Sequence, residues 1–289
     1  MARTYSFSPS LKSFTASTTT TAIWSPAEID SAGCVAFHLA MNTTGSTAST
    51  IALISRVRVK ANGQTVVDCT LDELRAYQER FSPKGNSDDT DGLSLNIPLN
   101  SLDTRSDDEG DRCQFMPGAS ATVEVVIVAG ANQAGTLMLG WTKTTVAPEF
   151  FMTLIESNTN VAASTTNGRS PLSGPGFVQG LGLPTQGLNR VRAILSGLEV
   201  ANIPGNRYNG ATAATLGDML VAMQNLYENP DAATDTETYQ FIKLNQGLEA
   251  NPATSWLELT TESNWGTGSP AASTAQTVYT LVPVQPQRA

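Results

Sequence analysis

The chain has 289 residues, enough for two domains of ordinary size that each bury their own core. Charged residues make up only 15% of the chain and its formal net charge is −9, so phosphate backbones and anionic lipid surfaces would repel it. This charge balance argues against direct nucleic-acid binding. The abundance of small and hydroxyl-bearing residues is typical of β-rich structure with long loops.

The first 31 residues are rich in serine and threonine and only weakly patterned. We expect an extended arm there, with Tyr5, Phe7 and Phe14 as isolated apolar anchors. From Cys34 onward, apolar residues alternate with small or polar ones, which predicts a half-buried strand. The inward positions of this strand are Val35, Phe37, Leu39 and Met41.

Residues 56–68, RVRVKANGQTVVD, have the pattern of two strands joined by a two-residue turn. Asn62 and Gly63 supply the two positive-φ positions of a type I′ turn, the strongest short hairpin signal. In a regular hairpin with this loop, Val59 would lie opposite Val66.

A helix is predicted to follow the hairpin directly. Residues 70–73, Thr-Leu-Asp-Glu, form a capping box in which the Thr70 hydroxyl and the Glu73 carboxylate each bind a free backbone amide. The helix therefore begins at Leu71, and Ser82-Pro83 ends it. The apolar side chains that line one side of it are Leu71, Leu74, Tyr77 and Phe81.

Further strands are predicted at residues 93–99, 121–128 and 136–141. In the first of them, the four apolar residues from Leu93 to Leu99 alternate and are expected to point inward. Residues 156–187 are rich in glycine, serine, threonine and proline and indicate a long connection.

After this connection the pattern starts again. Residues 190–192 repeat the Arg-Val-Arg of residues 56–58 after 134 positions, and Thr215-Leu216 repeats Thr70-Leu71 after 145, with a second amphipathic helix predicted up to residue 227. A period near half the chain predicts two copies of one domain: residues 1–155 with the N-terminal arm, and residues 156–289 with the linker. The second copy lacks Asn-Gly at its turn, and chance recurrence of strand, turn and helix is the alternative.

The residues needed for common catalytic sites are scarce. His38 is the only histidine, which excludes multi-histidine metal sites, and no Gly-x-Ser-x-Gly motif occurs. Gly174, Gly176 and Gly180 are close to the dinucleotide-binding spacing, with one extra residue before the last glycine, but prolines and glycines around them prevent the required strand and helix, so a linker is the better interpretation. Cys34, Cys69 and Cys113 are widely spaced and are expected to be buried free thiols. We expect no catalytic residue and no cofactor.

Two acidic clusters offer hard oxygen ligands. Neither fits the spacing of an EF-hand loop, so solvated loops are the simpler interpretation and a calcium site of another kind is the alternative. The calcium candidates are Asp88, Asp89, Asp91, Asp107, Asp108 and Asp111.

The segment SRVRVKANGQTVVD followed by TLDELRAY, within a β-rich domain that occurs twice, resembles the double jelly-roll major capsid proteins of tailless icosahedral viruses with an internal membrane. These are viruses of the corticovirus and tectivirus kind. The motif likeness covers residues 54–81 and, more faintly, 188–227. The resemblance implies an all-β fold with short helices and two tandem jelly-roll barrels. It also implies a homotrimer with a pseudo-hexagonal outline that tiles an icosahedral shell.

The same resemblance implies partners and a location. The partners would be neighbouring capsid trimers, penton or vertex proteins, and an internal membrane or its minor membrane proteins. The N-terminal arm would contact the shell interior or a neighbouring capsomer. The chain has no continuous apolar segment near its start, so we expect synthesis in the host cytoplasm and a final location in the virion.

Two other function classes compete with a shell protein. A two-domain β-sandwich adhesin or carbohydrate-binding module would need exposed aromatic residues, for which Trp141, Trp256 and Trp265 are candidates. Trp141 and Trp256 lie within strand patterns that are typical of a core. An enzyme on a jelly-roll or β-helical scaffold is the weakest alternative, because metal sites of the cupin kind need several histidines.

Overall fold

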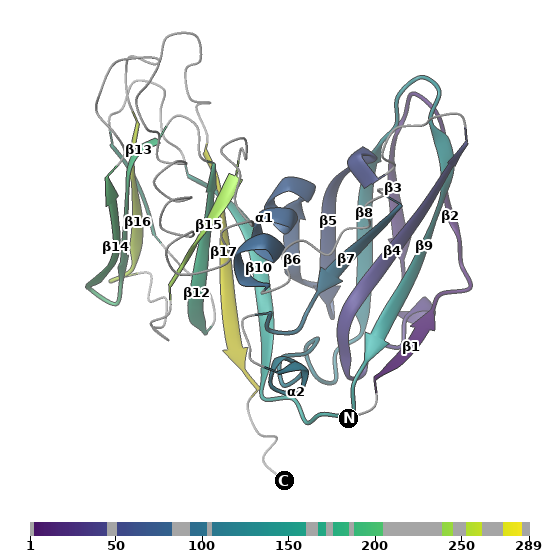
Figure 1. Cartoon of the computed structure of the whole chain (residues 1–289), viewed down its shortest axis with the longest axis horizontal. Coiled ribbons are helices and arrows are strands. Elements are labelled where there is room, and N and C mark those ends of the chain that lie inside the picture. The colour runs from purple at the N-terminus through teal and green to yellow at the C-terminus, as the bar shows by residue number, and fades with distance from the viewer. Residues whose placement is uncertain are drawn as a thin grey trace. The chain divides into compact units, whose positions relative to one another are not determined.

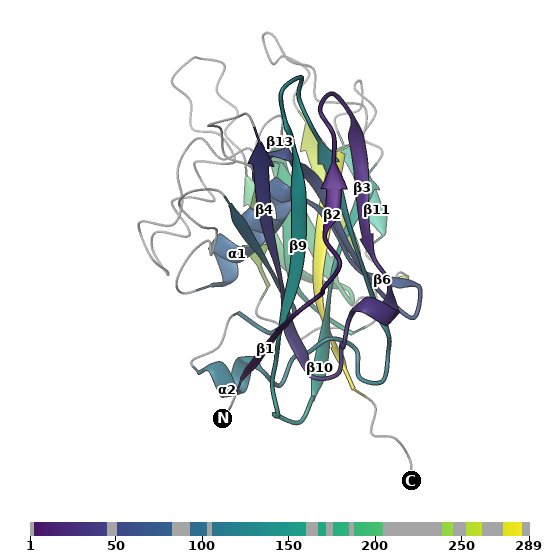
Figure 2. The ribbon, with the colours of Figure 1, turned by 90° about the vertical axis from the view of Figure 1, so that its right-hand side faces the viewer.

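The computed structural model describes residues 3–44, 51–82, 93–102, 106–159, 167–171, 176–184, 188–204, 239–244, 253–261 and 274–284. The chain divides into two compact units. Unit 1 comprises Met1–Gln78, Asn86–Ile155 and Val282–Ala289, and unit 2 comprises Glu79–Gly85 and Glu156–Leu281. Strands dominate the described part of both units (Figures 1 and 2). Within that part, no helix has the length and apolar character to cross a membrane.

Two antiparallel sheets make up most of unit 1, in the strand orders β1-β9-β4-β7 and β3-β8-β5-β6. Strand β2 also pairs with β9, and β10 joins β6 in parallel. The strands are β1 (Thr4–Phe7), β2 (Lys12–Phe14), β3 (Thr19–Trp24), β4 (Cys34–Thr44), β5 (Ile54–Ala61), β6 (Gln64–Thr70), β7 (Ser94–Pro98), β8 (Ala121–Val128), β9 (Ala134–Lys143) and β10 (Phe150–Thr159). The helices are η1 (Pro26–Glu28), η2 (Ile51–Leu53), α1 (Leu71–Phe81) and α2 (Asp107–Gly110).

Alternation along the strands builds the core of unit 1. The predicted inward residues of β4 are all buried, as are the inward residues of β8 and β9. Leu93 is an exception: its side chain is 45% exposed, because β7 begins only at Ser94. Two of the three predicted anchors of the N-terminal arm were also wrong. Phe14 is buried, whereas Tyr5 and Phe7 are exposed.

The predicted turn at Asn62-Gly63 is confirmed, with φ of 48° and 82° at its two residues. The predicted register is wrong, because Val59 pairs with Val67 and not with Val66. A β-bulge inserts Val66 as an extra residue between the Lys60 and Val59 pairs. Both Val66 and Val67 are buried, which two successive residues of a regular strand could not achieve on one face.

The capping box at the start of α1 is also confirmed. The Thr70 amide donates to Glu73 Oε2 over 2.7 Å, and the Glu73 amide donates to Thr70 Oγ1 over 3.3 Å. The four predicted apolar residues of α1 are buried. The capping box therefore fixes the start of α1 at Leu71, directly after β6.

Unit 2 contains two sheets as well, in the orders β11-β16-β13-β14 and β10-β17-β12-β15. Its strands are β11 (Asn167–Pro171), β12 (Phe177–Pro184), β13 (Leu188–Leu195), β14 (Leu198–Pro204), β15 (Tyr239–Lys243), β16 (Trp256–Thr261) and β17 (Thr274–Pro283). The sequence predicted a linker over residues 156–187, but β11 and β12 lie within it. The buried side chains of Val178, Leu181 and Leu183 show why β12 forms despite its glycines. The second predicted helix lies outside the described residues.

The hairpin of unit 2 repeats that of unit 1 in detail. Its turn residues, Ser196 and Gly197, have φ of 49° and 80°, so serine takes the place of asparagine in the same backbone conformation. The bulge recurs too, with Val200 as the extra residue between the Ile194 and Ala193 pairs. Turn and bulge both lie 134 positions after their counterparts in unit 1.

The strands beside the hairpin repeat with the same spacing. Arg58 faces Glu124 across β5 and β8, and Arg192 faces Glu258 across β13 and β16. In the other sheet, a bulge at Val35 in β4 corresponds to a bulge at Gln179 in β12. The carbonyl of each bulge residue accepts from an amide just after the neighbouring strand, Leu99 N at 2.8 Å and Leu244 N at 2.7 Å. Matching irregularities in both sheets favour duplication over chance recurrence.

Replacing Gly63 or Gly197 with valine is expected to destabilise its own unit by about 1–3 kcal/mol, because a β-branched residue resists positive φ. No other atom lies near the position that a Cβ would take at either glycine, so the loss would come from backbone strain and not from a clash. Thermal melts would measure it. Asn at either position, which tolerates this conformation, serves as the control, and equal melting of the valine and asparagine variants would contradict the turn assignment.

Candidate assembly surfaces

His38, the only histidine, has both ring nitrogens occupied. Its Nδ1 lies 2.6 Å from Asn96 Oδ1 on β7, and its Nε2 lies 2.6 Å from Thr142 Oγ1 on β9. The ring therefore links three adjacent strands on the outer side of their sheet. This is a structural role for the imidazole.

Of the three glycines of the apparent dinucleotide-binding motif, Gly176 and Gly180 lie in the described chain and Gly174 lies outside it. Gly180 lies on β12, and a Cβ there would lie only 2.6 Å from Cζ of Phe81. Gly176, just before β12, has φ of 86°. No strand-to-helix turn is present among the described residues of this segment, so the motif lacks the structure that binds a dinucleotide.

Of the acidic candidates, Asp111 has the clearest surroundings. Its side chain is 3% exposed, and Arg3 donates to both of its oxygens, over 2.9 and 2.7 Å. Asp108 is exposed. The described residues contain no group of three potential metal ligands. Asp88, Asp89 and Asp91 lie outside the described residues, as does the side chain of Asp107, so the calcium alternative stays a prediction.

The three cysteines are buried and form no disulfide, as predicted. Burial raises the pKa of both the Cys34 and the Cys113 thiol to about 12. Each of these thiols also donates to a backbone carbonyl, of Ala36 and Leu99 respectively. They pack as small apolar groups and are poor nucleophiles.

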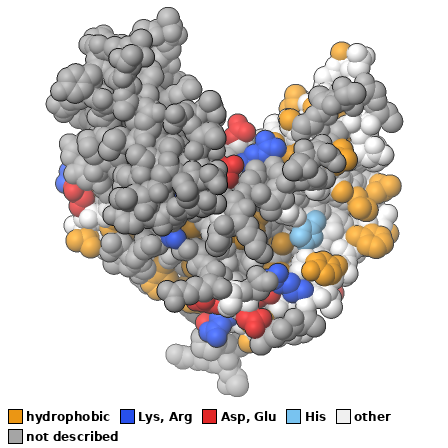
Figure 3. All heavy atoms as spheres, viewed as in Figure 1, with side chains coloured by type: hydrophobic (Ala, Val, Ile, Leu, Met, Phe, Trp, Pro, Cys, Tyr) orange, Lys and Arg blue, Asp and Glu red, His pale blue; other side chains and the backbone are white. Residues whose placement is uncertain are grey.

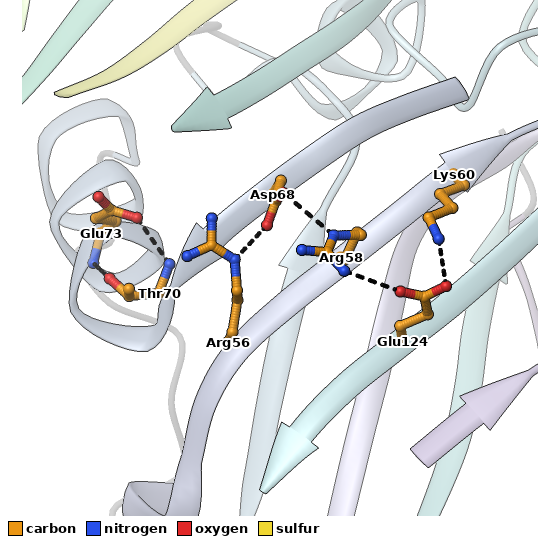
Figure 4. Close-up of polar contacts among 7 residues, drawn as sticks. All are labelled: Arg56, Arg58, Lys60, Asp68, Thr70, Glu73 and Glu124. Carbon is orange, nitrogen blue, oxygen red and sulfur yellow. Dashed lines mark hydrogen bonds and ion pairs between the residues drawn. The ribbon is translucent and has the colours of Figure 1, made fainter. Parts of the chain in front are cut away.

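The two outer faces of unit 1 differ in charge. On the sheet β3-β8-β5-β6, five side chains form a charge ladder that runs across three strands (Figure 4). Its members are Arg56, Arg58, Lys60, Asp68 and Glu124. Asp68 Oδ1 lies 2.5 Å from Arg56 Nε, and Asp68 Oδ2 lies 3.1 Å from Arg58 Nε. The bulge at Val66 brings Asp68 opposite Arg58.

Glu124 joins the other end of the ladder. Its carboxylate accepts from Lys60 Nζ over 2.5 Å and from Arg58 Nη1 over 3.2 Å. Burial alone would raise the pKa of Glu124, but these two hydrogen bonds outweigh burial and hold the pKa below its ordinary value. The alternation of Arg56, Arg58 and Lys60 with valines in the sequence indicates that the three basic residues share one side of β5, but only the sheet order reveals which acids face them.

Replacing Glu124 with glutamine is expected to lower the free energy of unfolding by about 1–2 kcal/mol, because two cations lose a half-buried partner. Since the pKa of Glu124 is lower in the folded state, this contribution is complete above the ordinary glutamate pKa and disappears in acid. Urea titrations at neutral and acid pH would measure it.

Glu149→Gln is the control for this prediction. Glu149 pairs with Arg112, and both side chains are more than half exposed, so the expected loss is below about 0.5 kcal/mol. Equal losses in the two variants would show that the ladder adds nothing beyond a surface pair.

On the outer face of the sheet β1-β9-β4-β7, the outward positions of these four strands hold no aspartate, glutamate, lysine or arginine among the described residues. We call this surface the open face. Its outward positions on β4, β9 and β7 are held by small or neutral residues such as Ala36, and in register Asn96 of β7 and Gly140 of β9 lie on either side of His38. Large apolar side chains are exposed at Tyr5, Phe7 and Met138. Figure 3 shows orange hydrophobic side chains near the pale-blue histidine on this side of the molecule.

The tryptophans proposed for sugar binding do not form an exposed group in the described chain. Trp141 is buried at 5% exposure, and Trp256 is half-buried. Trp265 lies outside the described residues.

Solved structures show a full-length likeness to this chain. The major capsid protein P2 from bacteriophage PM2 matches over 99% of both chains, with 11% sequence identity and a TM-score of 0.64. The fold is the double jelly roll. The STIV MCP matches over 97% of this chain and 96% of its own, with 9% identity and a TM-score of 0.61.

A capsid model of the virus PBCV-1 is also similar. It matches over 98% of this chain and 93% of its own, with 11% identity and a TM-score of 0.52. No protein-family model matches the chain, and no curated protein matches it in sequence. The double jelly roll confirms the predicted fold class, since each unit places its strands in two facing sheets with the same order.

Proposed function

We propose that this chain is the major capsid protein of an icosahedral virus and that its function is self-assembly, without catalysis. The observation that carries the proposal is the match over 99% of both chains to the major capsid protein of bacteriophage PM2. A match limited to one barrel would also fit an isolated binding module. A match that includes both barrels, in the same order along the chain, fits a subunit of a viral shell.

The internal repeat supports a homotrimer. Two barrels with matching strands, turn and bulges give one chain two similar lateral units, and three chains around a threefold axis give six. Six similar units approximate a hexagon, which can tile a closed shell. Neighbouring trimers, vertex proteins and an internal membrane or its minor proteins would then be the partners, and the virion the location.

Light scattering of the purified full-length chain, combined with negative-stain images, tests the proposal. We expect particles of about three times the 30.5 kDa of one chain, with a hexagonal outline, that associate further at high concentration. A chain that stays monomeric at every concentration would contradict the proposal. A monomer that is retained by immobilised sugar would instead support the carbohydrate-binding alternative.

A further inference from the structure

The open face of unit 1 has a counterpart in unit 2. Ala36 and Gly180 correspond, since each follows the bulge residue whose carbonyl accepts from the amide after the neighbouring strand. Ala36 pairs with Thr142, and Gly180 pairs with Tyr279. The outward positions around Gly180 therefore form the equivalent surface in unit 2.

In unit 2 this surface is covered. Phe81 belongs to unit 2 and lies edge-on to two aromatic rings, with centroids 5.0 Å from Tyr279 and 6.1 Å from Phe241. The Lys243 ammonium lies 6.0 Å from the Phe81 ring. Phe81, Phe241 and Tyr279 are all almost fully buried. One aromatic side chain of this protein thus docks on the outer face of one of its jelly-roll sheets.

In unit 1 Thr142, the counterpart of Tyr279, is buried as well, but the edge strand β1 beside it carries aromatic residues that nothing covers. All four residues of β1 are exposed, so this edge strand is covered on neither face. Tyr5 is 76% exposed beside Thr142, and Phe7 is 68% exposed beside Gly140. Exposed aromatic residues on a surface without charges are typical of the centre of a protein interface.

We propose that the open face of unit 1 docks a second copy of this chain, with Tyr5 and Phe7 at the centre of the contact. The inference rests on the proposed capsid function, which surrounds every chain with identical copies. The equivalent face of unit 2 already binds an apolar side chain of this same protein, Phe81. A second copy of the chain can supply side chains of the same kind to the open face of unit 1.

The distribution of charge also favours a second copy of the chain as the partner of the open face. Two copies that each carry a net charge of −9 repel one another, and contact is least costly where neither side must desolvate an ion. The charge ladder lies on the other sheet of unit 1, so the open face can be buried without breaking an ion pair of that ladder.

The test is a double variant, Tyr5→Asp with Phe7→Asp, in the full-length chain. Both side chains are exposed, so circular dichroism and melting of the monomer should not change. The apparent dissociation concentration from sedimentation or light scattering should rise about 30-fold or more, as for the loss of interface hot spots. A photo-crosslinking phenylalanine analogue at position 7 should yield a covalent product of two chains.

The control is Ile23→Asp with Val128→Asp. These side chains are 47% and 51% exposed on the other sheet of unit 1, and their replacement should leave association within about threefold of the original. If the original chain associates and the Tyr5/Phe7 variant associates equally well, the docking face is wrong while the capsid proposal stands. Equal losses in both variants would also overturn the docking face. If the original chain never associates, the capsid proposal fails and the docking face fails with it.

Discussion

Replacing Phe81 with alanine is expected to destabilise unit 2 by about 3–5 kcal/mol, the usual cost of deleting a buried phenylalanine. The side chain is 3% exposed and packs on Tyr279, Phe241 and the backbone at Gly180. A loss of this size is a large share of the stability of a typical domain. Urea denaturation of the full-length chain would show it as a lower midpoint.

Gly180→Ala tests the contact between Phe81 and Gly180 by changing the glycine instead of the phenylalanine. In the original chain the new methyl group would lie 2.6 Å from Phe81 Cζ, and such overpacking costs about 1–3 kcal/mol. In the Phe81→Ala background the ring contact is gone and only the Ile242 carbonyl oxygen, at 3.3 Å, stays close to the methyl group, so the cost should fall. A double-mutant cycle would then give a coupling of about 1–3 kcal/mol. Additive losses would mean that the two residues do not meet.

Features that depend on neighbouring residues could be predicted from the sequence. The turn at Asn62-Gly63 follows from the backbone freedom of two residues, and the capping box from the spacing of Thr70 and Glu73. The inward face of β4 follows from simple alternation. The double jelly roll itself came from a likeness of these local motifs and their recurrence.

Features that depend on distant partners could not be predicted. The bulge at Val66 is set by the burial of both Val66 and Val67 within the sheet. Strand β12 looked like a linker because its glycines resemble loop residues, yet Gly180 is required by Phe81, about a hundred positions earlier in the chain. Close approach between segments of this separation leaves no periodic signal.

The candidate surfaces likewise have parts that could be predicted from neighbouring residues and parts that could not. The basic half of the charge ladder was visible as alternation along β5, whereas Asp68 and Glu124 are brought to it by the bulge and by the sheet order. The open face was missed because Tyr5 and Phe7 were assumed to be buried. In a short edge strand, an apolar residue fits an inward position and an interface position equally well, and only the observed exposure separates the two.

Replacing Trp24 with alanine is expected to destabilise unit 1 by about 3–5 kcal/mol. Trp24 has no exposed surface, and its Nε1 donates to the Ser10 carbonyl over 3.0 Å while the Lys12 ammonium lies 5.9 Å from its ring. It therefore holds the N-terminal segment against β3. Trp24→Phe keeps much of the apolar contact but removes the hydrogen bond, and should cost less than half as much.

Ile23→Ala, at the neighbouring position, is the control for the Trp24 variants. Ile23 is 47% exposed on the outer face of β3, so its truncation should change the free energy of unfolding by no more than about 0.5 kcal/mol. Limited proteolysis adds a second measurement. Since the indole anchors Ser10, cleavage near the N-terminus should be faster in Trp24→Ala than in the control. Equal cleavage rates together with equal midpoints would show that the arm is held by other contacts, such as the pair formed by Arg3 and Asp111.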